Sequence, residues 1–565
     1  MNAGKKQITE IFSKTRILEI PFFQRSYVWD DVQWERMLED MENICSTNKP
    51  YFLGSVILKK QDDNGNIKTV IDGQQRLTTL FILFKVYFLM TNRNDVFELL
   101  FKTLDGKISL QHNHNDIESF TNILDLNELT EIDGKNKIFG AYNFFKKNLC
   151  LEKIDYQKIL SNVSFVVIDM EKEEENEQQI FDTINSLGVT LTTAELLKNY
   201  FFNRDVNLYD KFWKKIFEKD EDVKKYWDRE FFTGNQKRTF IDLFFFSFLQ
   251  IKIQEKELKV TTDDKIGFSK LEQLFESYKK FIKIYLNNNK NSILTEIKEY
   301  AIIFQENFDY DIVDKELPKN DSIDRINAII FGLDNSTLIP YVLYILKNVV
   351  NADNKNELFG FIETYIMRRM VVHSNTKNYS RFFTDSLINK EILSKEQFAE
   401  FLEKQEDKLN FLPSDEDLKN GFNDSKLINK QSLGILYFIE SKSRDDKHST
   451  VLKGIKQYSL EHLMPKKWEN NWENLTNQAK ITERNRKLLT LGNLAIITQS
   501  LNSSIRDADW KTKKEGKGEN KKGLNQYASD LVTLNDFLQL EEWNEIAINN
   551  RATFLFKKAK KIWKI

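Results

Sequence analysis

The spacing of apolar residues changes twice along this chain of 565 residues and divides it into three parts. In the first part, short apolar runs bounded by Asp, Asn and Gly predict β-strands at RILEI (16–20), YFLGSVILKK (51–60) and IKTVIDG (67–73). A helix is expected at VQWERMLEDMENIC (32–45), and a further strand at SNVSFVVIDM (161–170). These patterns predict an α+β domain over residues 1–205.

Residues 206–440 carry apolar side chains mostly at helical spacing, as in FIDLFFFSFLQIKI (240–253) and ELFGFIETYIMRRMVV (357–372). They predict a helical connecting domain. Beyond it, strand patterns at QYSLEHLMP and LTLGNLAIIT and a final basic helix predict a separate module over residues 441–565. The expected fold is therefore multidomain and mainly α, with an α+β N-terminal domain.

Composition restricts the class of protein further. The chain is 41% hydrophobic and 30% charged with only 6 Pro, which is typical of a folded, mainly helical protein. The run LTTLFILFKVYFLM (77–90) is shorter than a membrane span of about 20 residues and contains Lys85, so we expect a buried core helix and no membrane partner. Two cysteines and the absence of a signal-like N-terminus predict a cytoplasmic protein, and the Asn-, Lys- and Ile-rich usage suggests a bacterial source.

A net charge of −2 excludes a global field that would draw the whole molecule to nucleic acid, so any such surface must be local. Residues 511–523 hold six lysines against two glutamates, and residues 551–565 hold six basic residues and no acid. Either patch alone is typical of a solvated loop. Beside a nuclease motif, we expect Lys511, Lys513 and Lys514 to contact the DNA backbone.

The C-terminal module contains the strongest candidate chemistry. His462 lies at a predicted strand end, where an imidazole can act as a general base, and the adjacent Glu461 can bind a hard cation. Downstream, Asn493 can fix the His tautomer and Asn502 can supply a neutral oxygen to a metal. Each residue alone is more typical of a turn or cap, but their order predicts a strand–strand–helix site around one Mg²⁺ or Mn²⁺ ion.

The N-terminal domain offers a second candidate site. The strand IKTVIDG runs into Gln74, Gln75 and Arg76 at the start of an apolar helix, a place suited to phosphate, with Asp72 available for metal or water. The alternative is a tight turn at Asp72-Gly73 with Arg76 paired to a carboxylate.

Two neighbouring segments also allow two interpretations. IPFFQRSYVWD (20–30) places Gln24 and Arg25 near aromatic residues, which suits stacking on a nucleotide as well as a core-capping cluster. QQIFDTINSLGVTLTTAELLKNYFF (178–202) has a capping box at Thr192 and Glu195 and could form a helix-turn-helix that reads DNA.

Both ends of the chain resemble the GmrSD-type restriction endonucleases, a type IV, modification-dependent family. At the C-terminal end the resemblance rests on Glu-His-Leu-Met-Pro, Trp468, Leu491-Gly492-Asn493-Leu494, Asn502 and Lys513. It implies an HNH nuclease with a ββα-metal fold, with His462 as base and Glu461 and Asn502 near the metal. The third HNH position is Asn here rather than His.

At the N-terminal end the resemblance rests on Ile-Pro-x-x-Gln-Arg-x-Tyr-x-Trp, Asp-Gly-Gln-Gln-Arg-Leu-Thr-Thr-Leu and Phe-x-x-Ile-Asn-x-x-Gly. It implies a ParB/sulfiredoxin-like domain that binds a nucleoside triphosphate, GTP or another, and can hydrolyse it. The implied nucleotide residues are Asp72, Gly73, Gln74, Gln75 and Arg76, with Gln24, Arg25 and Asn185 nearby. This favours the nucleotide interpretation over the helix-turn-helix.

The leading hypothesis is a single-chain, nucleotide-regulated endonuclease that cuts or nicks modified foreign double-stranded DNA, as in phage defence. Members of the family act on DNA with glucosylated hydroxymethylcytosine or respond to phosphorothioate backbones; the sequence leaves the trigger, the nucleotide and a homo-oligomeric state open. The competing hypotheses are a nucleotide-gated DNA-binding regulator with a silent HNH site and an NTPase that does not cleave DNA.

Overall fold

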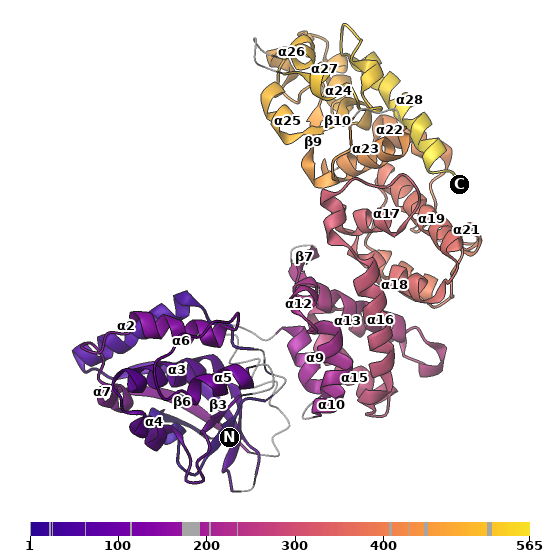
Figure 1. Ribbon diagram of the computed structural model, residues 1–565. Helices are drawn as coiled ribbons and strands as arrows, with labels where there is room; N and C mark the ends of the chain where they lie inside the picture. Colours follow the sequence, from indigo (N-terminus) through magenta and orange to yellow (C-terminus); the bar gives the residue numbers. More distant parts are fainter. Residues whose placement is uncertain are drawn as a thin grey trace. The chain divides into compact units, whose positions relative to one another are not determined.

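The computed structural model describes residues 2–21, 24, 26–62, 64–112, 116–171, 192–202, 205–233, 236–405, 409–427, 429–445, 450–516 and 522–565. The chain forms two compact units, Met1–Trp213 (unit 1) and Lys214–Ile565 (unit 2). The chain as a whole is mainly helical, and unit 1 combines helices with a β-sheet, as the predicted α+β domain requires (Figure 1). The further division of unit 2 at residue 440 stays a prediction.

A six-stranded mixed sheet in the order β1-β6-β3-β4-β2-β5 forms the centre of unit 1. Its strands are β1 (Asn2–Gln7), β2 (Ile17–Glu19), β3 (Tyr51–Lys60), β4 (Ile67–Asp72), β5 (Leu110–Gln111) and β6 (Val163–Met170). The four predicted strands are confirmed as β2, β3, β4 and β6. The pattern does not predict β1, because NAGKKQ contains no apolar run; this segment becomes a strand by antiparallel pairing with β6.

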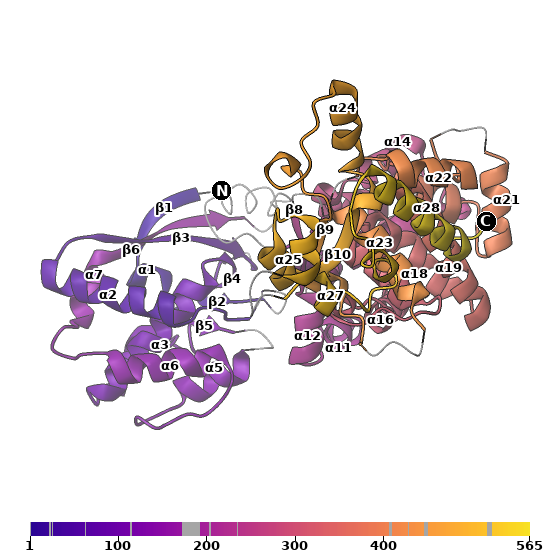
Figure 2. The same cartoon turned by 90° about the horizontal axis from the view of Figure 1, so that it is seen from above.

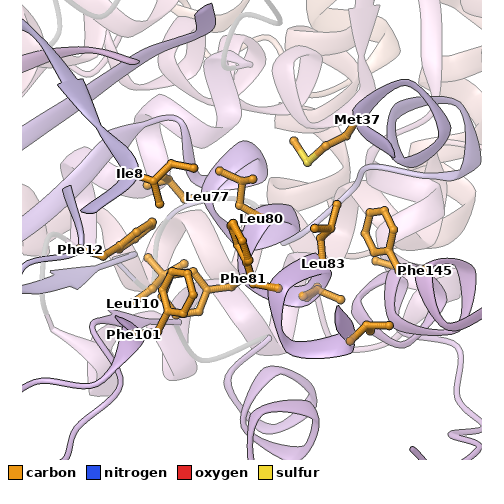
Figure 3. Packing of buried hydrophobic residues seen from close by; sticks show 14 of the residues in the cluster. Ile8, Phe12, Met37, Leu77, Leu80, Phe81, Leu83, Phe101, Leu110 and Phe145 are labelled. Atoms are coloured by element: carbon orange, nitrogen blue, oxygen red, sulfur yellow. The ribbon is translucent and has the colours of Figure 1, made fainter. Parts of the chain in front are cut away.

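The helices of unit 1 are α1 (Ile8–Ile11), α2 (Asp31–Thr47), α3 (Gln74–Met90), α4 (Asn94–Phe101), α5 (Ile117–Leu124), α6 (Lys137–Asn148), α7 (Tyr156–Asn162), α9 (Thr193–Phe202) and α10 (Val206–Tyr209). The core lies between the sheet and helices such as α2, α3 and α6. Leu83 of α3 lies beside Phe145 of α6, whereas Phe81 of α3 packs against Phe12 and Phe101 (Figure 3). Helix α3 is buried on nearly all sides, as its lack of a polar face predicts.

Lys85 shows how α3 accommodates a charge in this core. Its ammonium donates to Asn94 Oδ1 at 2.7 Å and lies 5.0 Å from the centre of the Phe97 ring. Burial lowers the pKa of Lys85 to about 8. The prediction of a buried core helix is confirmed, and among the described residues no helix combines the length and apolarity that a membrane crossing requires.

Unit 2 is a helical body with two small sheets, β7 (Glu230–Thr233) with β8 (Gln236–Thr239), and β9 (Tyr458–His462) with β10 (Leu494–Thr498). Its helices are α11 (Lys215–Phe217), α12 (Glu221–Trp227), α13 (Phe240–Lys252), α14 (Thr262–Phe268), α15 (Leu274–Tyr285), α16 (Leu294–Asn307), α17 (Ile323–Asn327), α18 (Ile339–Asn348), α19 (Ala352–Val371), α20 (Tyr379–Arg381), α21 (Lys395–Glu403), α22 (Asp415–Asp424), α23 (Asn429–Ser443), α24 (Gln478–Lys487), α25 (Gln499–Ile505), α26 (Trp510–Glu515), α27 (Leu524–Tyr527) and α28 (Glu545–Ile562). Residues 206–440 are predicted to be helical, and the structure adds the β7–β8 hairpin, which the apolar spacing does not indicate.

The long helices α19 and α28, which are far apart in the sequence, are joined by buried hydrogen bonds inside unit 2. Buried Arg368 of α19 donates from Nε to the carbonyl of Trp563, just after α28, at 2.7 Å. The Trp563 indole donates to Glu363 Oε1 at 3.1 Å, and Glu363 is itself paired with Arg325. Fully buried charges of this kind are stable only when paired and hydrogen-bonded, so this network fixes α28 against the helical body.

Candidate functional site

The strands β9 and β10 form an antiparallel pair in which His462 faces Leu494 and Glu461 faces Ala495. Helix α25 follows β10 directly, and α23 and α25 both pack against the pair (Figure 2). The strand–strand–helix order predicted from the sequence is therefore present, with both predicted chemical residues at the end of β9.

Glu461 is buried, with 5% of its surface exposed, and its partner is Lys513 of α26. The Lys513 ammonium donates to Glu461 Oε1 and, at 2.7 Å, to the carbonyl of His462. Burial raises the pKa of Glu461 and lowers that of Lys513, because each charge loses its hydration, while their attraction opposes both shifts. One ammonium thus holds both the side chain of Glu461 and the backbone of the next residue.

His462 is half-buried, and its imidazole is held in the neutral state near neutral pH. Loss of hydration is the largest cause, followed by the positive charges of Lys466 and Lys513, and together they lower its pKa to about 4. The nearby Asp507 opposes them. A neutral imidazole is the form that can take a proton from water, as a general base must.

Asn493 does not contact the imidazole. Its Oδ1 accepts from the Met464 amide at 2.8 Å and from the Trp543 indole at 2.9 Å. Its Nδ2 donates to the carbonyls of Met464 at 2.9 Å and Leu488 at 3.0 Å. All of its hydrogen-bonding groups are thus engaged elsewhere, so the prediction that Asn493 orients the His462 ring is corrected: it fixes the backbone that follows His462.

Arg551 of α28 and Gly492, which directly precedes Asn493, hold the backbone around Asn493; the sequence indicated Arg551 only as one of the six basic residues of 551–565. Fully buried Arg551 donates to the carbonyls of Leu491, Gly492 and Leu494, which surround Asn493. Gly492 lies so close to the carbonyl of Ile548 that any side chain there would collide with it. The Gly-Asn pair is therefore a close contact between the turn that precedes β10 and helix α28, which no local spacing could reveal.

Asn502 of α25 is tied to β9 beside Glu461. Its Nδ2 donates to Ser459 Oγ at 3.0 Å and to the carbonyl of Leu460 at 3.1 Å. Within the described parts of the chain, no hydrogen bond to its Oδ1 is found, so this oxygen can serve as a ligand.

A metal would find few protein ligands at this site. The described segments contain no group of three or more His, Cys, Asp or Glu side chains placed to hold one. Glu461 and Asn502 offer oxygen donors, which suit Mg²⁺ or Mn²⁺. Since Mg²⁺ keeps several waters and takes only one or two carboxylates beside substrate phosphates, the donor set fits a largely hydrated ion.

The three lysines predicted to contact a DNA backbone differ in the structure. Lys511 is exposed. Lys513 is fully buried against Glu461 and cannot reach a phosphate, which corrects that prediction. Lys514 donates to the carbonyl of Leu540 at 2.7 Å. The helical spacing could have indicated that Lys513 is buried, because Trp510, three residues earlier on the same face of α26, is a buried aromatic residue.

In unit 1, Asp72 and Arg76 form an ion pair of 3.1 Å at the start of α3, and each is about one quarter exposed. Arg76 also donates to the carbonyl of Ser55 at 2.9 Å. The Arg76 side chain packs directly against Gly54, where a Cβ atom would lie 2.5 Å from an Arg76 nitrogen. Gly73 precedes the helix with φ 99°, a conformation that favours glycine. The sequence-based alternative, an Asp-Gly turn with a paired Arg76, is thus present.

Gln24 and Gln75, two of the predicted glutamines of this site, form hydrogen bonds with backbone groups of neighbouring segments. Gln75 accepts from the Val28 amide at 2.9 Å and donates to the carbonyl of Ser26 at 3.3 Å, which fixes that segment onto α3. Gln24 donates to the carbonyl of Ile71 at 2.9 Å, and Gln74 is buried. The motifs around Gln24 and Gln75 thus come together in space, as their joint prediction requires.

Two predicted nucleotide residues, Arg25 and Asn185, lie outside the described residues, as does most of the predicted helix-turn-helix. Its second helix is α9. The Thr192 amide donates to Glu195 Oε2 at 2.8 Å, and the Glu195 amide donates to Thr192 Oγ1 at 3.2 Å. The predicted capping box is confirmed.

Comparison with known proteins gives two matches, one at each end of the chain. The family model "GmrSD restriction endonuclease, N-terminal domain" matches residues 8–202. The family model "GmrSD restriction endonucleases, C-terminal domain" matches residues 412–558. Together the matched ranges cover more than half of the chain and contain both candidate sites. A search of curated proteins finds no match.

Proposed function

Because the chain belongs to the GmrSD restriction endonuclease family, we propose that it is a metal-dependent DNA endonuclease of the HNH, ββα-metal type whose chemistry takes place at Glu461, His462 and Asn502. One observation carries the proposal: β9 ends in a buried carboxylate followed by a half-buried neutral imidazole, and α25 brings an amide oxygen to the same strand.

Each residue has a distinct part in phosphodiester hydrolysis. His462 takes the proton from the attacking water, for which its neutral imidazole is suited. Glu461 and Asn502 would hold Mg²⁺ or Mn²⁺, which would stabilise the charge on the phosphate and on the leaving 3′ oxygen. Asn493 acts indirectly by fixing the Met464 backbone beyond His462.

Metal dependence is tested by following the conversion of supercoiled plasmid to nicked and linear forms. We expect cleavage with added Mg²⁺ or Mn²⁺, none after chelation, and recovery when metal is restored. Asn502→Ala removes one ligand while its side chain is only half-buried, so cleavage should then require more metal. Cleavage that is unaffected by chelation would exclude the proposed chemistry.

For unit 1 we propose a ParB/sulfiredoxin-like nucleotide sensor that regulates cleavage of modified foreign DNA. Its support is the partly exposed Asp72–Arg76 pair at the start of α3, where backbone N–H groups and a guanidinium can meet a phosphate. Gln75 and Gln24 contribute by holding the surrounding backbone.

The sensor is tested by nucleotide binding and by phosphate release. Arg76→Ala should weaken both, and it should change how plasmid cleavage responds to a nucleoside triphosphate, while His462→Ala leaves nucleotide binding intact. Parallel assays on plain DNA and on DNA with glucosylated hydroxymethylcytosine or phosphorothioates test the target class. Nucleotide binding that is unchanged in Arg76→Ala would remove this site from the proposal.

A further inference from the structure

Lys513 has an arrangement that the proposed chemistry does not use. It is a fully buried lysine on a six-residue helix, and its ammonium contacts the proposed metal ligand Glu461 and the backbone of the proposed base His462. We propose that Lys513 makes metal binding at this site depend on bound DNA, because it already neutralises the carboxylate of Glu461. This inference rests on the proposed nuclease function.

Several contacts fix the position of Lys513. Asp509 caps α26 by accepting from the Thr512 amide at 2.9 Å. The Trp510 indole donates to the carbonyl of Leu540 at 2.9 Å, and its ring lies 5.0 Å from that of Trp543. With α26 held in this way, the Lys513 side chain extends inward to β9, where water does not compete for the carboxylate of Glu461.

The charges at the site explain the proposed dependence. A carboxylate without a neighbouring cation attracts a divalent ion strongly, but the Glu461–Lys513 pair carries no net charge. Asn502 would add one amide oxygen to hold a metal there, and the Lys513 ammonium, which binds the same Glu461 carboxylate, would repel it. Burial makes this repulsion stronger than it would be at the surface.

DNA supplies what the protein lacks. A phosphate contributes negative charge and oxygen ligands, and Mg²⁺ sites with few carboxylates are completed in this way. Metal and DNA should therefore each strengthen binding of the other by the same factor, as linkage requires. A nuclease with this property holds little metal until its substrate is present.

Lys513 also aligns the two chemical residues. Since the same ammonium binds the Glu461 carboxylate and the His462 carbonyl, it fixes the metal ligand relative to the base. Lys513 is thus a positioning residue, and its role is separable from catalysis by measuring metal affinity rather than activity.

The test uses the full chain in a His462→Ala background, so that DNA stays intact, and measures Mn²⁺ affinity by electron paramagnetic resonance with and without a short duplex. We expect the duplex to tighten Mn²⁺ binding by about tenfold or more. In Lys513→Met, Mn²⁺ should bind more tightly without DNA than in the parent, and the effect of the duplex should shrink to about threefold or less.

Two further variants keep the test decisive. Lys513→Gln is also neutral but can still donate to Glu461, so it gives the same test if Lys513→Met fails to fold. Lys513→Arg keeps the charge and should preserve the effect of the duplex. Mn²⁺ binding by the neutral variants that equals or falls below that of the parent without DNA, with the effect of the duplex unchanged, would overturn the inference.

Glu461→Gln separates this inference from the nuclease proposal. If Glu461→Gln binds Mn²⁺ as well as the parent does, or if the parent binds none even with DNA, the proposed metal site itself is wrong. If Glu461→Gln loses binding while the neutral Lys513 variants behave as the parent, only the role of Lys513 is wrong.

Discussion

Replacing Asn493 by alanine should destabilise unit 2 before it affects any chemical step. The side chain is completely buried and makes four hydrogen bonds, two with the amide and carbonyl of Met464, one with the carbonyl of Leu488 and one with the indole of Trp543. Alanine would leave these buried groups without partners.

The size of the effect follows from those bonds. Each buried group left without a partner costs about 1–3 kcal/mol, and relaxation around the smaller side chain recovers part of the loss. We therefore expect the free energy of unfolding of unit 2 to fall by about 4 kcal/mol. Urea denaturation followed by tryptophan fluorescence measures this, and hydrogen exchange of the β9 and β10 amides shows whether the loss is local.

Asn502→Ala is the matched control, because Asn502 is the same residue type at the same site but half-buried and bonded only through Nδ2. It should lose about 1 kcal/mol of stability while strongly weakening cleavage. The reasoning is refuted if Asn493→Ala keeps its denaturation midpoint and amide protection yet loses cleavage as completely as His462→Ala. Asn493 would then act on the chemistry directly.

Two predictions concern unit 1. Gly54→Ala should displace Arg76 and lower nucleotide affinity, because the new Cβ atom would lie 2.5 Å from the Arg76 guanidinium and φ at this position is 126°. Gly4→Ala on β1 is the control, because a Cβ atom there would meet nothing within 4 Å. Equal nucleotide affinities of the two variants would contradict this prediction. Burial lowers the pKa of His112, bonded to Thr78, from 6.5 to about 3. The unfolded chain then binds the proton first, so stability falls as pH drops from 6.5 toward 3, by up to about 1.4 kcal/mol per pH unit. His112→Gln should flatten this loss in acid denaturation curves, and an unchanged slope would show that His112 does not cause it.

Much of the fold follows from local patterns. Short apolar runs identified β2, β3, β4 and β6, and a longer, strongly apolar run identified α3. These elements could be predicted because the side chains that they bury are consecutive or nearly so in the sequence. Strand β1 and the β7–β8 hairpin have no apolar pattern in their sequences that would predict a strand. Each depends on a partner strand, which single-sequence spacing does not specify.

The candidate site shows the same division. Sequence order placed Glu461, His462 and Asn502 together, and the structure brings them to one strand and the helix beside it. Partners distant in sequence could not be predicted: Asn493 bonds to Trp543, 50 residues away, and Lys513 to Glu461, 52 residues away. Charge composition favoured a DNA contact for Lys513, whereas the helical spacing from Trp510 indicates burial.

The most direct test of the proposed nuclease site is the rate at which supercoiled plasmid is nicked by His462→Ala in saturating Mg²⁺, compared with the unchanged chain. If His462 is the general base, removing it should slow nicking by about 10²–10⁴-fold while nucleotide binding by unit 1 and the denaturation midpoint stay the same. Nicking at an equal rate by the two proteins would contradict the assignment of the active site to the end of β9.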